Sequence, residues 1–282
     1  MRTLRRWTGT RLLGGTTSEN TPDPVPTSPD GTQQPGLAPP LLPARARRPA
    51  AIAAACCAVV VAVLGAFAFR RSQANAVDRP VDLWLRHHLS SHLHVLSDIS
   101  YLGGGQVVTV LTVVLVVACL AARRVNAAAV SLISVIATVG LTEYVLKPLV
   151  HETIQHGWLT YPSGHTSSLF TLIAVVGVLM VGPPRWRPRP GLRPLIMLAL
   201  ILVGCAVAVA MTVLQYHYFT DTIAGAAWGT CVVLTATFLA DSAGVRRRLG
   251  AARRRRRRFP DRKGLLTVRS LHADMGRHHR SP

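Results

Sequence analysis

Three short polar clusters each lie at one end of a long apolar run in this chain. They are Lys147-Pro148, Pro162-Ser163-Gly164-His165, and His217 with Asp221. The apolar runs beside them are long enough to cross the hydrocarbon core of a bilayer. Ionisable residues at the ends of membrane helices are a functional-site hypothesis by default, so we treat the three clusters as one candidate site.

Ser163 and Gly164 stand where an apolar run begins, which predicts a helix N-terminus there. The unpaired N–H groups and positive dipole end of such a terminus favour an anion, and a glycine lets the anion come close to the backbone. Lys147 would add a compensating point charge. We therefore expect Lys147, Ser163 and Gly164 to bind a phosphate group.

His217 and Asp221 are four residues apart, so a helix would place both side chains on one face. The Asp221 carboxylate can then keep one imidazole nitrogen protonated and turn the other nitrogen towards a substrate as a nucleophile. His165 is left to protonate the departing oxygen as a general acid. The expected catalytic residues are therefore His217, Asp221 and His165.

In this order, the motifs Lys147-Pro148, Pro162 to Thr166, and His217-x-x-x-Asp221 resemble those of the type 2 phosphatidic acid phosphatase superfamily. The resemblance covers roughly residues 78–240. It implies a hydrolase, without metal ion or cofactor, that acts on lipid phosphates or diphosphates through a phosphohistidine intermediate. It assigns His217 as the nucleophile, Asp221 as its partner, His165 as the general acid, and Lys147, Ser163 and Gly164 as the phosphate ligands.

The chain departs from the family pattern at Ile154 and Met211, where that pattern has arginines. Arginine makes bidentate, permanently charged contacts to phosphate that a lysine does not reproduce. An alternative hypothesis is therefore a weakly active or inactive homologue that binds lipid phosphates or acts as a membrane interaction protein. A third hypothesis, a transporter that uses Glu143 and Lys147 within the bilayer, leaves the other two clusters unexplained.

Each motif also has a simpler interpretation. Ser163 can serve only as a helix N-cap, and Lys147 can pair with Glu143 one turn earlier or reach the lipid headgroups. His151 and His156 surround a glutamate as in zinc proteases, but they are five residues apart rather than four. We therefore predict no metal site in this segment.

The composition excludes an ordinary soluble domain. The 282 residues are 49% hydrophobic and 16% charged, with a mean hydropathy of +0.31. We predict an all-α, polytopic membrane bundle with six transmembrane helices, at about 50–69, 106–122, 127–146, 166–181, 195–214 and 221–239. The segment 81–99 has apolar residues at helical spacing among polar ones, which indicates an amphipathic helix at the membrane interface.

The two ends of the chain differ from this apolar middle. Residues 1–48 are rich in Pro, Thr, Ser and Gly and are predicted to be a disordered arm, followed by a membrane domain over 49–242. Residues 243–282 are predicted to be a disordered, Arg-rich cytoplasmic tail. The formal net charge of +20 lies largely in this tail, which we expect to bind anionic lipids rather than nucleic acid.

Short basic loops predict the orientation. In a six-span arrangement, Arg123-Arg124 and the segment from Arg185 to Arg193 lie on the same side of the membrane as both termini. The positive-inside rule makes that side cytoplasmic. The sequence therefore predicts a multi-pass protein of the cell membrane, with both termini cytoplasmic and the candidate site on the extracytoplasmic face.

Overall fold

The computed structural model describes residues 40–154, 157–182, 189 and 191–258. Within these residues the chain is helical and contains no β-strand, which confirms the predicted all-α class. The helices in chain order are α1 (Ala44–Ala68), α2 (Asp78–Leu89), η1 (Ser90–His92), α3 (Leu93–Tyr101), α4 (Gly105–Ala121), α5 (Val125–Leu141), η2 (Thr142–Leu146), α6 (Lys147–Val150), α7 (Gly164–Val181), α8 (Leu192–Val213) and α9 (Phe219–Arg258).

Six stretches of the described residues are long and apolar enough to cross a membrane, which confirms the predicted number of spans. They are Ala44–Ala68, Asp78–Ala121, Val125–Val150, Gly164–Val181, Leu192–Val213 and Phe219–Ala243. Large apolar side chains on their outer faces are exposed, as lipid-facing side chains must be; Ile52, Val110 and Leu202 are examples.

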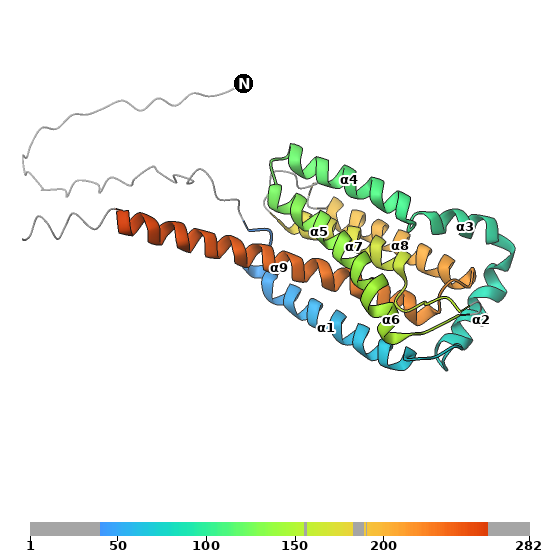
Figure 1. Cartoon of the computed structure of the whole chain (residues 1–282). Coiled ribbons are helices and arrows are strands. Elements are labelled where there is room, and N and C mark those ends of the chain that lie inside the picture. Colours follow the sequence, from blue (N-terminus) through green and yellow to red (C-terminus); the bar gives the residue numbers. More distant parts are fainter. Residues whose placement is uncertain (1–39, 155–156, 183–188, 190, 259–282) are drawn as a thin grey trace, which may run out of the picture. The chain divides into compact units, whose positions relative to one another are not determined.

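Helices α7 and α9 make the most extensive contact in the bundle, and α1 packs along α9 on another side (Figure 1). The close approach of α7 and α9 depends on two glycines of α9. A Cβ atom at Gly225 would lie 2.7 Å from the Ser163 carbonyl oxygen, and a Cβ atom at Gly229 would collide with the Ser167 carbonyl oxygen. Small residues at helix contacts are typical of membrane bundles, where van der Waals packing drives association.

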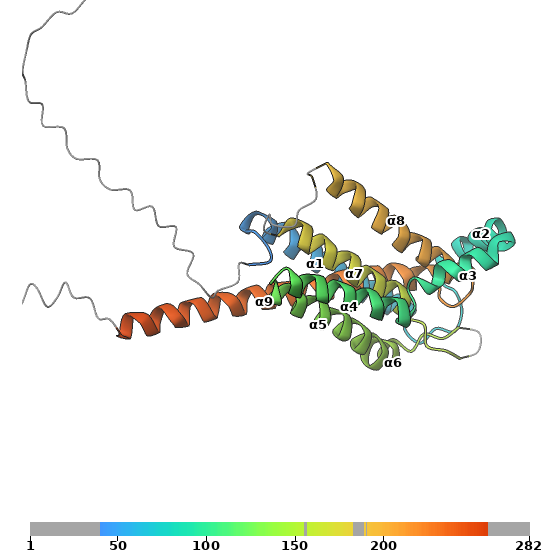
Figure 2. The same ribbon diagram turned by 90° about the horizontal axis from the view of Figure 1, so that it is seen from above.

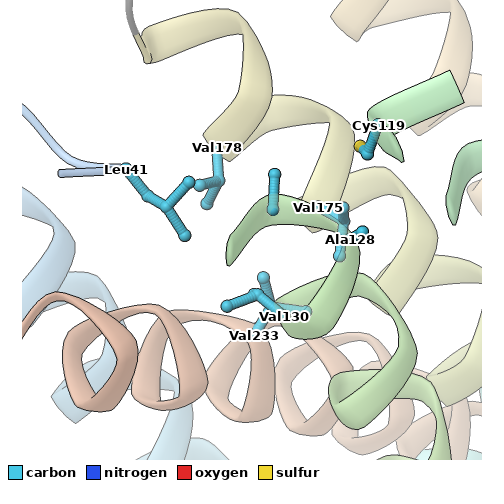
Figure 3. Close-up of a cluster of buried hydrophobic side chains, with 8 residues drawn as sticks. Leu41, Cys119, Ala128, Val130, Val175, Val178 and Val233 are labelled. Atoms are coloured by element: carbon cyan, nitrogen blue, oxygen red, sulfur yellow. The ribbon is translucent and has the colours of Figure 1, made fainter. Parts of the chain in front are cut away.

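The main apolar core lies between α4, α5, α7 and α9 (Figure 3). Apart from Leu41, its side chains are small or branched at Cβ, so the helix backbones approach closely. They are Leu41, Cys119, Ala127, Ala128, Val130, Val175, Val178 and Val233. Buried hydroxyls in the same bundle bond mostly to carbonyls of their own helix, while the Thr138 and Thr171 hydroxyls bond to each other across α5 and α7 at 3.0 Å.

The segment predicted as an amphipathic helix over 81–99 forms α2, η1 and α3, which lie at one end of the bundle (Figures 1 and 2). Leu85 of α2 and Leu96 of α3 bury their side chains against Ala210 and Val213 of α8. The apolar face of this segment therefore rests on α8 instead of only on lipid.

Two boundaries differ from those expected. Helix α1 begins at Ala44, so the last residues of the predicted arm belong to it, and α9 continues to Arg258, past the predicted domain end at 242. The remaining parts of the arm and the tail, residues 1–39 and 259–282, lie outside the described residues, as do residues 183–188 of the basic loop. A further feature without a sequence signal is the π-helical turn η2 between α5 and α6, and such turns occur frequently at functional sites.

Candidate active site

A cavity of about 570 Å³ opens at the end of the bundle where the three polar clusters meet. Four of the six predicted site residues line it: Lys147, Gly164, His165 and His217. The other two, Ser163 and Asp221, are fully buried beside it. The structure therefore brings together residues that lie up to 74 positions apart in the chain, from Lys147 to Asp221.

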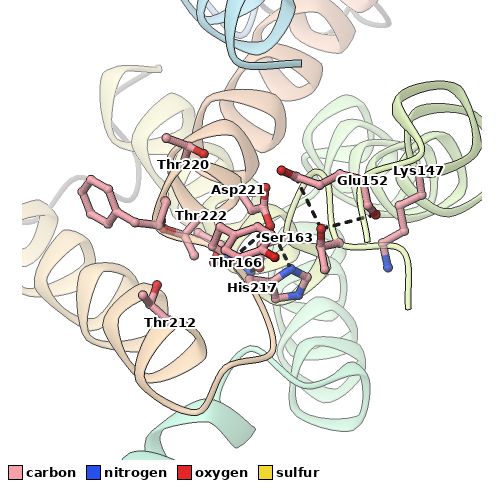
Figure 4. A network of polar contacts seen from close by, with 12 residues as sticks. Lys147, Glu152, Ser163, Thr166, Thr212, His217, Thr220, Asp221 and Thr222 are labelled. Atoms are coloured by element: carbon pink, nitrogen blue, oxygen red, sulfur yellow. Dashed lines mark hydrogen bonds and ion pairs between the residues drawn. The ribbon is translucent and has the colours of Figure 1, made fainter. Parts of the chain in front are cut away.

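His217 and Asp221 lie side by side at the start of α9 (Figure 4). The His217 Nδ1 atom is 3.7 Å from Asp221 Oδ2, which is longer than a hydrogen bond, and it is buried without a hydrogen-bond partner among the described residues. The same carboxylate oxygen accepts a hydrogen bond of 3.0 Å from the Tyr218 backbone N–H. Asp221 is thus fixed behind the imidazole, and catalytic hydrogen bonds are often this long before a substrate binds.

The start of α7 is attached to the start of α9. Ser163 is the N-cap of α7: its Oγ accepts a bond of 3.5 Å from the Thr166 N–H and lies 3.2 Å from the Thr166 hydroxyl. Its own backbone N–H donates to the Asp221 carbonyl at 3.1 Å. The Ser163 side chain therefore serves the helix terminus and does not line the cavity, whereas Gly164 and His165, the next two residues, do.

Lys147 is paired inside the site. Its Nζ lies 2.7 Å from Glu143 Oε1 and 2.9 Å from Glu143 Oε2, one helical turn earlier. Glu143 Oε1 is also 3.2 Å from the position that a Cβ atom would take at Gly164. A carboxylate of the protein itself therefore lies at the beginning of α7, next to the lysine that we expected to contact phosphate.

Residues 128–242 match the family model described as the PAP2 superfamily. The match supports membership of the type 2 phosphatidic acid phosphatase superfamily. The matched PAP2 segment runs from α5 to α9 and contains all six predicted site residues, while α1 to α4 precede it. No curated protein and no solved structure matches the chain. PAP2 proteins generally hydrolyse phosphate esters, so the match and the six apolar helices together support a membrane phosphatase-type protein.

Both departures from the PAP2 motifs fall beside His217. Met211 lines the cavity that holds His217 and His165, and its side chain is buried. Ile154 lines a second cavity, which His217 also borders. The two positions that carry arginine in the family pattern are therefore apolar here.

Glu152 is a member of the site that the sequence did not reveal. It is 1% exposed, and its carboxyl lies beside that of Asp221 (Figure 4). The Thr160 hydroxyl donates to Glu152 Oε2 at 3.4 Å, but Glu152 Oε1 and Asp221 Oδ1 are both buried without a donor. A single proton shared between these two oxygens would satisfy both, since a protonated carboxyl is a donor.

The electrostatics favour that shared proton. Burial, followed by the charge of Asp221 and the hydrogen bond to it, raises the pKa of Glu152 to about 10. Burial, followed by the charge of Glu152 and then that of Asp221, also raises the pKa of Tyr218 to about 12. At neutral pH the pair therefore carries one negative charge rather than two, because two adjacent carboxylates cannot both ionise readily.

The described residues contain no group of three or more His, Cys, Asp or Glu side chains arranged to hold a metal ion. The polar groups that line the cavity include two imidazoles, one ammonium–carboxylate pair and the N-terminus of a helix. Such groups can bind an anion, attack it with a ring nitrogen and supply a proton to a leaving oxygen.

Proposed function

We propose that this protein is an integral membrane hydrolase that removes phosphate from lipid phosphates or isoprenoid diphosphates through a phosphohistidine intermediate. The observation that carries the proposal is the single cavity in which His217, His165, Lys147 and Gly164 meet, with Asp221 buried behind His217. Nucleophile, orienting carboxylate, proton donor and anion-binding helix terminus are thus within one site.

The reaction proceeds in two steps. Asp221 holds the proton on Nδ1 of His217, so the Nε2 lone pair attacks the phosphorus atom and the phosphorus–oxygen bond to the lipid breaks. His165 gives its proton to the departing oxygen. A water molecule then attacks the phosphohistidine and gives a proton to His165, and the phosphorus–nitrogen bond breaks. Inorganic phosphate leaves, and both histidines return to their starting states.

Phosphate binding relies on the beginning of α7 and on Lys147. The free N–H groups of the first turn point out of the helix end and carry partial positive charge. Lys147 adds a full charge, which its pair with Glu143 partly offsets. A phosphate that enters this corner competes with the Glu143 carboxylate for the same cation.

The setting in the membrane is also part of the proposal. In this proposal both termini lie in the cytoplasm and the cavity lies on the extracytoplasmic face of the cell membrane, which the short basic segments support through the positive-inside rule. The arm over 1–48 and the basic tail over 243–282 flank the catalytic domain, and the tail binds anionic lipid headgroups. The partners are thus a lipid phosphate substrate and the bilayer, without nucleic acid.

The test is release of inorganic phosphate from phosphatidic acid and from an isoprenoid diphosphate by the purified protein in detergent. We expect turnover by the wild type and loss of nearly all turnover in His217→Ala. His94→Ala is the matched control, because His94 is exposed and borders neither cavity. Wild-type release no higher than that of His217→Ala would refute the proposal.

A second candidate is a binding protein with little or no turnover. The apolar side chains of Met211 and Ile154 beside His217 favour it, since they replace permanently charged groups. The same panel separates the two candidates: a binder retains phosphatidic acid in a pull-down with lipid vesicles but releases no phosphate and accumulates no acid-labile phosphorylated His217.

A further inference from the structure

His217 stands between two cavities. Besides the cavity described above, it borders a second cavity of about 510 Å³, which lies towards α2. The lining of this second cavity includes Arg79 and Arg86 of α2, together with Ile154. One wall is therefore formed by a helix that precedes the PAP2 segment in the chain.

The two arginines lie on the same face of α2. They are seven residues apart, which is close to two helical turns, so their side chains leave the helix in nearly the same direction. Asp82, between them, also lines the cavity. Because this wall carries two guanidinium groups and one carboxylate, its net charge is positive. Within the described residues, no ion pair joins either arginine to a carboxylate.

Helix α2 is held in place by the start of α9. Asp78 is fully buried and accepts bonds from the Thr220 backbone N–H at 2.8 Å and from the Thr220 hydroxyl at 2.9 Å. Asp82 accepts a bond of 3.3 Å from the Phe219 N–H. These two carboxylates of α2 satisfy free N–H groups of the first turn of α9, which begins two residues after His217. The position of the arginines relative to His217 is thereby set by a buried polar contact.

We propose that Arg79 and Arg86 bind the phosphoryl group at His217 from the side of the second cavity and replace the arginine that is missing at position 154. The inference rests on the proposed function, because it assigns the missing cations of the same site. Ile154, Arg79 and Arg86 line the same cavity as His217, so the arginines of α2 share a cavity with the position where the family pattern has an arginine. Guanidinium suits the task because it offers planar, bidentate contacts to phosphate oxygens.

A simpler role for these arginines is contact with lipid headgroups, since both side chains are exposed and α2 is amphipathic. The two roles differ in one measurable respect. If the arginines contact headgroups, their loss lowers kcat/KM only for lipid substrates. If they contact the phosphoryl group, their loss lowers kcat/KM for every phosphate ester, including water-soluble ones.

The first experiment compares Arg79→Ala, Arg86→Ala and the double variant with the wild type. The substrates are a water-soluble aryl phosphate and phosphatidic acid in uncharged detergent micelles. We expect kcat/KM to fall on the order of 10-fold or more for each single variant on both substrates, and further in the double variant. Arg71→Ala is the matched control, because Arg71 is an exposed arginine that borders neither cavity, and it should keep wild-type activity.

Unchanged kcat/KM of the double variant on the soluble substrate would overturn the inference, as would a loss no larger than that of Arg71→Ala. A loss confined to phosphatidic acid, with no loss on the soluble substrate, would show that the arginines contact the lipid surface instead. Arg79→Lys and Arg86→Lys guard against a folding defect: they keep the charge without the bidentate geometry, and we expect intermediate activity from them.

A binding measurement separates this inference from the proposed function. The dissociation constant for inorganic phosphate, measured by ³¹P NMR, should rise in the double variant whether or not the wild type turns over lipid. If the wild type is inactive but the double variant binds phosphate more weakly, the arginine assignment stands and the hydrolase proposal fails. If phosphate binding is equal in both, the arginine assignment fails.

A rescue experiment tests the shared location. Ile154→Arg, introduced into the double variant, places a guanidinium in the cavity from which two were removed. We expect recovery of part of the lost kcat/KM, while Ile154→Leu in the same background recovers none. Equal activity of these two triple variants would overturn the claim that the arginines of α2 replace the one missing at position 154.

Discussion

Replacing Glu152 by Gln tests the shared proton at the site. The glutamine side chain has nearly the same shape as protonated glutamate and carries a permanent N–H donor for Asp221 Oδ1, which is buried without one. Unlike glutamate, it does not ionise when the protein unfolds. The variant therefore keeps the contact with Asp221. It avoids the cost in folding free energy of holding a proton on a buried carboxyl at neutral pH.

The size of the effect follows from the pKa of Glu152. The folded-state pKa is about 10 and the ordinary value is 4.5, so between these pH values the folded protein holds a proton that the unfolded chain releases. The wild type therefore loses stability as the pH rises above about 4.5, by roughly 1.4 kcal/mol per pH unit. At pH 7 the glutamine variant gains up to about 3 kcal/mol over the wild type, and below pH 4.5 it gains nothing.

The assay is thermal unfolding of the purified protein in detergent, followed by tryptophan fluorescence from pH 5 to pH 8. The melting temperature of Glu152→Gln should be close to that of the wild type at pH 5 and several degrees higher at pH 8. Glu143→Gln is the control, because it makes the same chemical change at a partly exposed carboxylate that pairs with Lys147. Its melting temperature should show no increase over the wild type that grows with pH. A difference between Glu152→Gln and the wild type that stays constant from pH 5 to pH 8 would refute the shared proton.

Two packing predictions concern α9. Gly229→Ala should lower the melting temperature, with a loss of about 1–3 kcal/mol, because its methyl group collides with the Ser167 carbonyl; Gly140→Ala, which meets no atom within 4 Å, should not lower it. Equal melting temperatures for the two variants would contradict the close contact of α7 and α9. Asp241→Ala should cost about 1–3 kcal/mol, because the carboxylate accepts bonds from two buried backbone N–H groups before α1 at 2.8 and 3.1 Å. Asp98→Ala, at an exposed position, is its control, and an equal effect of the two would count against this anchor.

The number of spans was predictable because lipid imposes a minimum length on every crossing helix. What the apolar pattern does not carry is the local geometry of the helix ends. The π-helical turn η2, which precedes Lys147, depends on how α5 packs, and residue types alone do not specify it. Helix α9 runs on to Arg258 because an Arg-rich segment can continue a helix that is already formed, while composition alone suggests a disordered tail.

The site was predictable where close spacing along the chain determines proximity. His217 and Asp221 are four residues apart and do lie close together, although His217 precedes the first residue of α9 by two positions and so is not on the helix face that the spacing predicts. Glu152 was missed because its burial depends on the return of the chain between α6 and α7, where the Thr160 N–H donates to the Glu152 carbonyl at 3.0 Å. Arg79 and Arg86 look like any basic residues of an amphipathic helix, and only the cavity beside His217 distinguishes them.

Helix α9 links the candidate site mechanically to the far end of the described chain. Its 40 residues correspond to a rod of about 60 Å, roughly twice the hydrocarbon thickness of a bilayer. Asp221 lies in its first turn, and the arginines 246–248 and 253–258 lie in its last turns. A twist or tilt applied at the basic end is transmitted along an unbroken backbone, so the position of the carboxylate behind His217 is coupled to forces exerted on the last turns of α9.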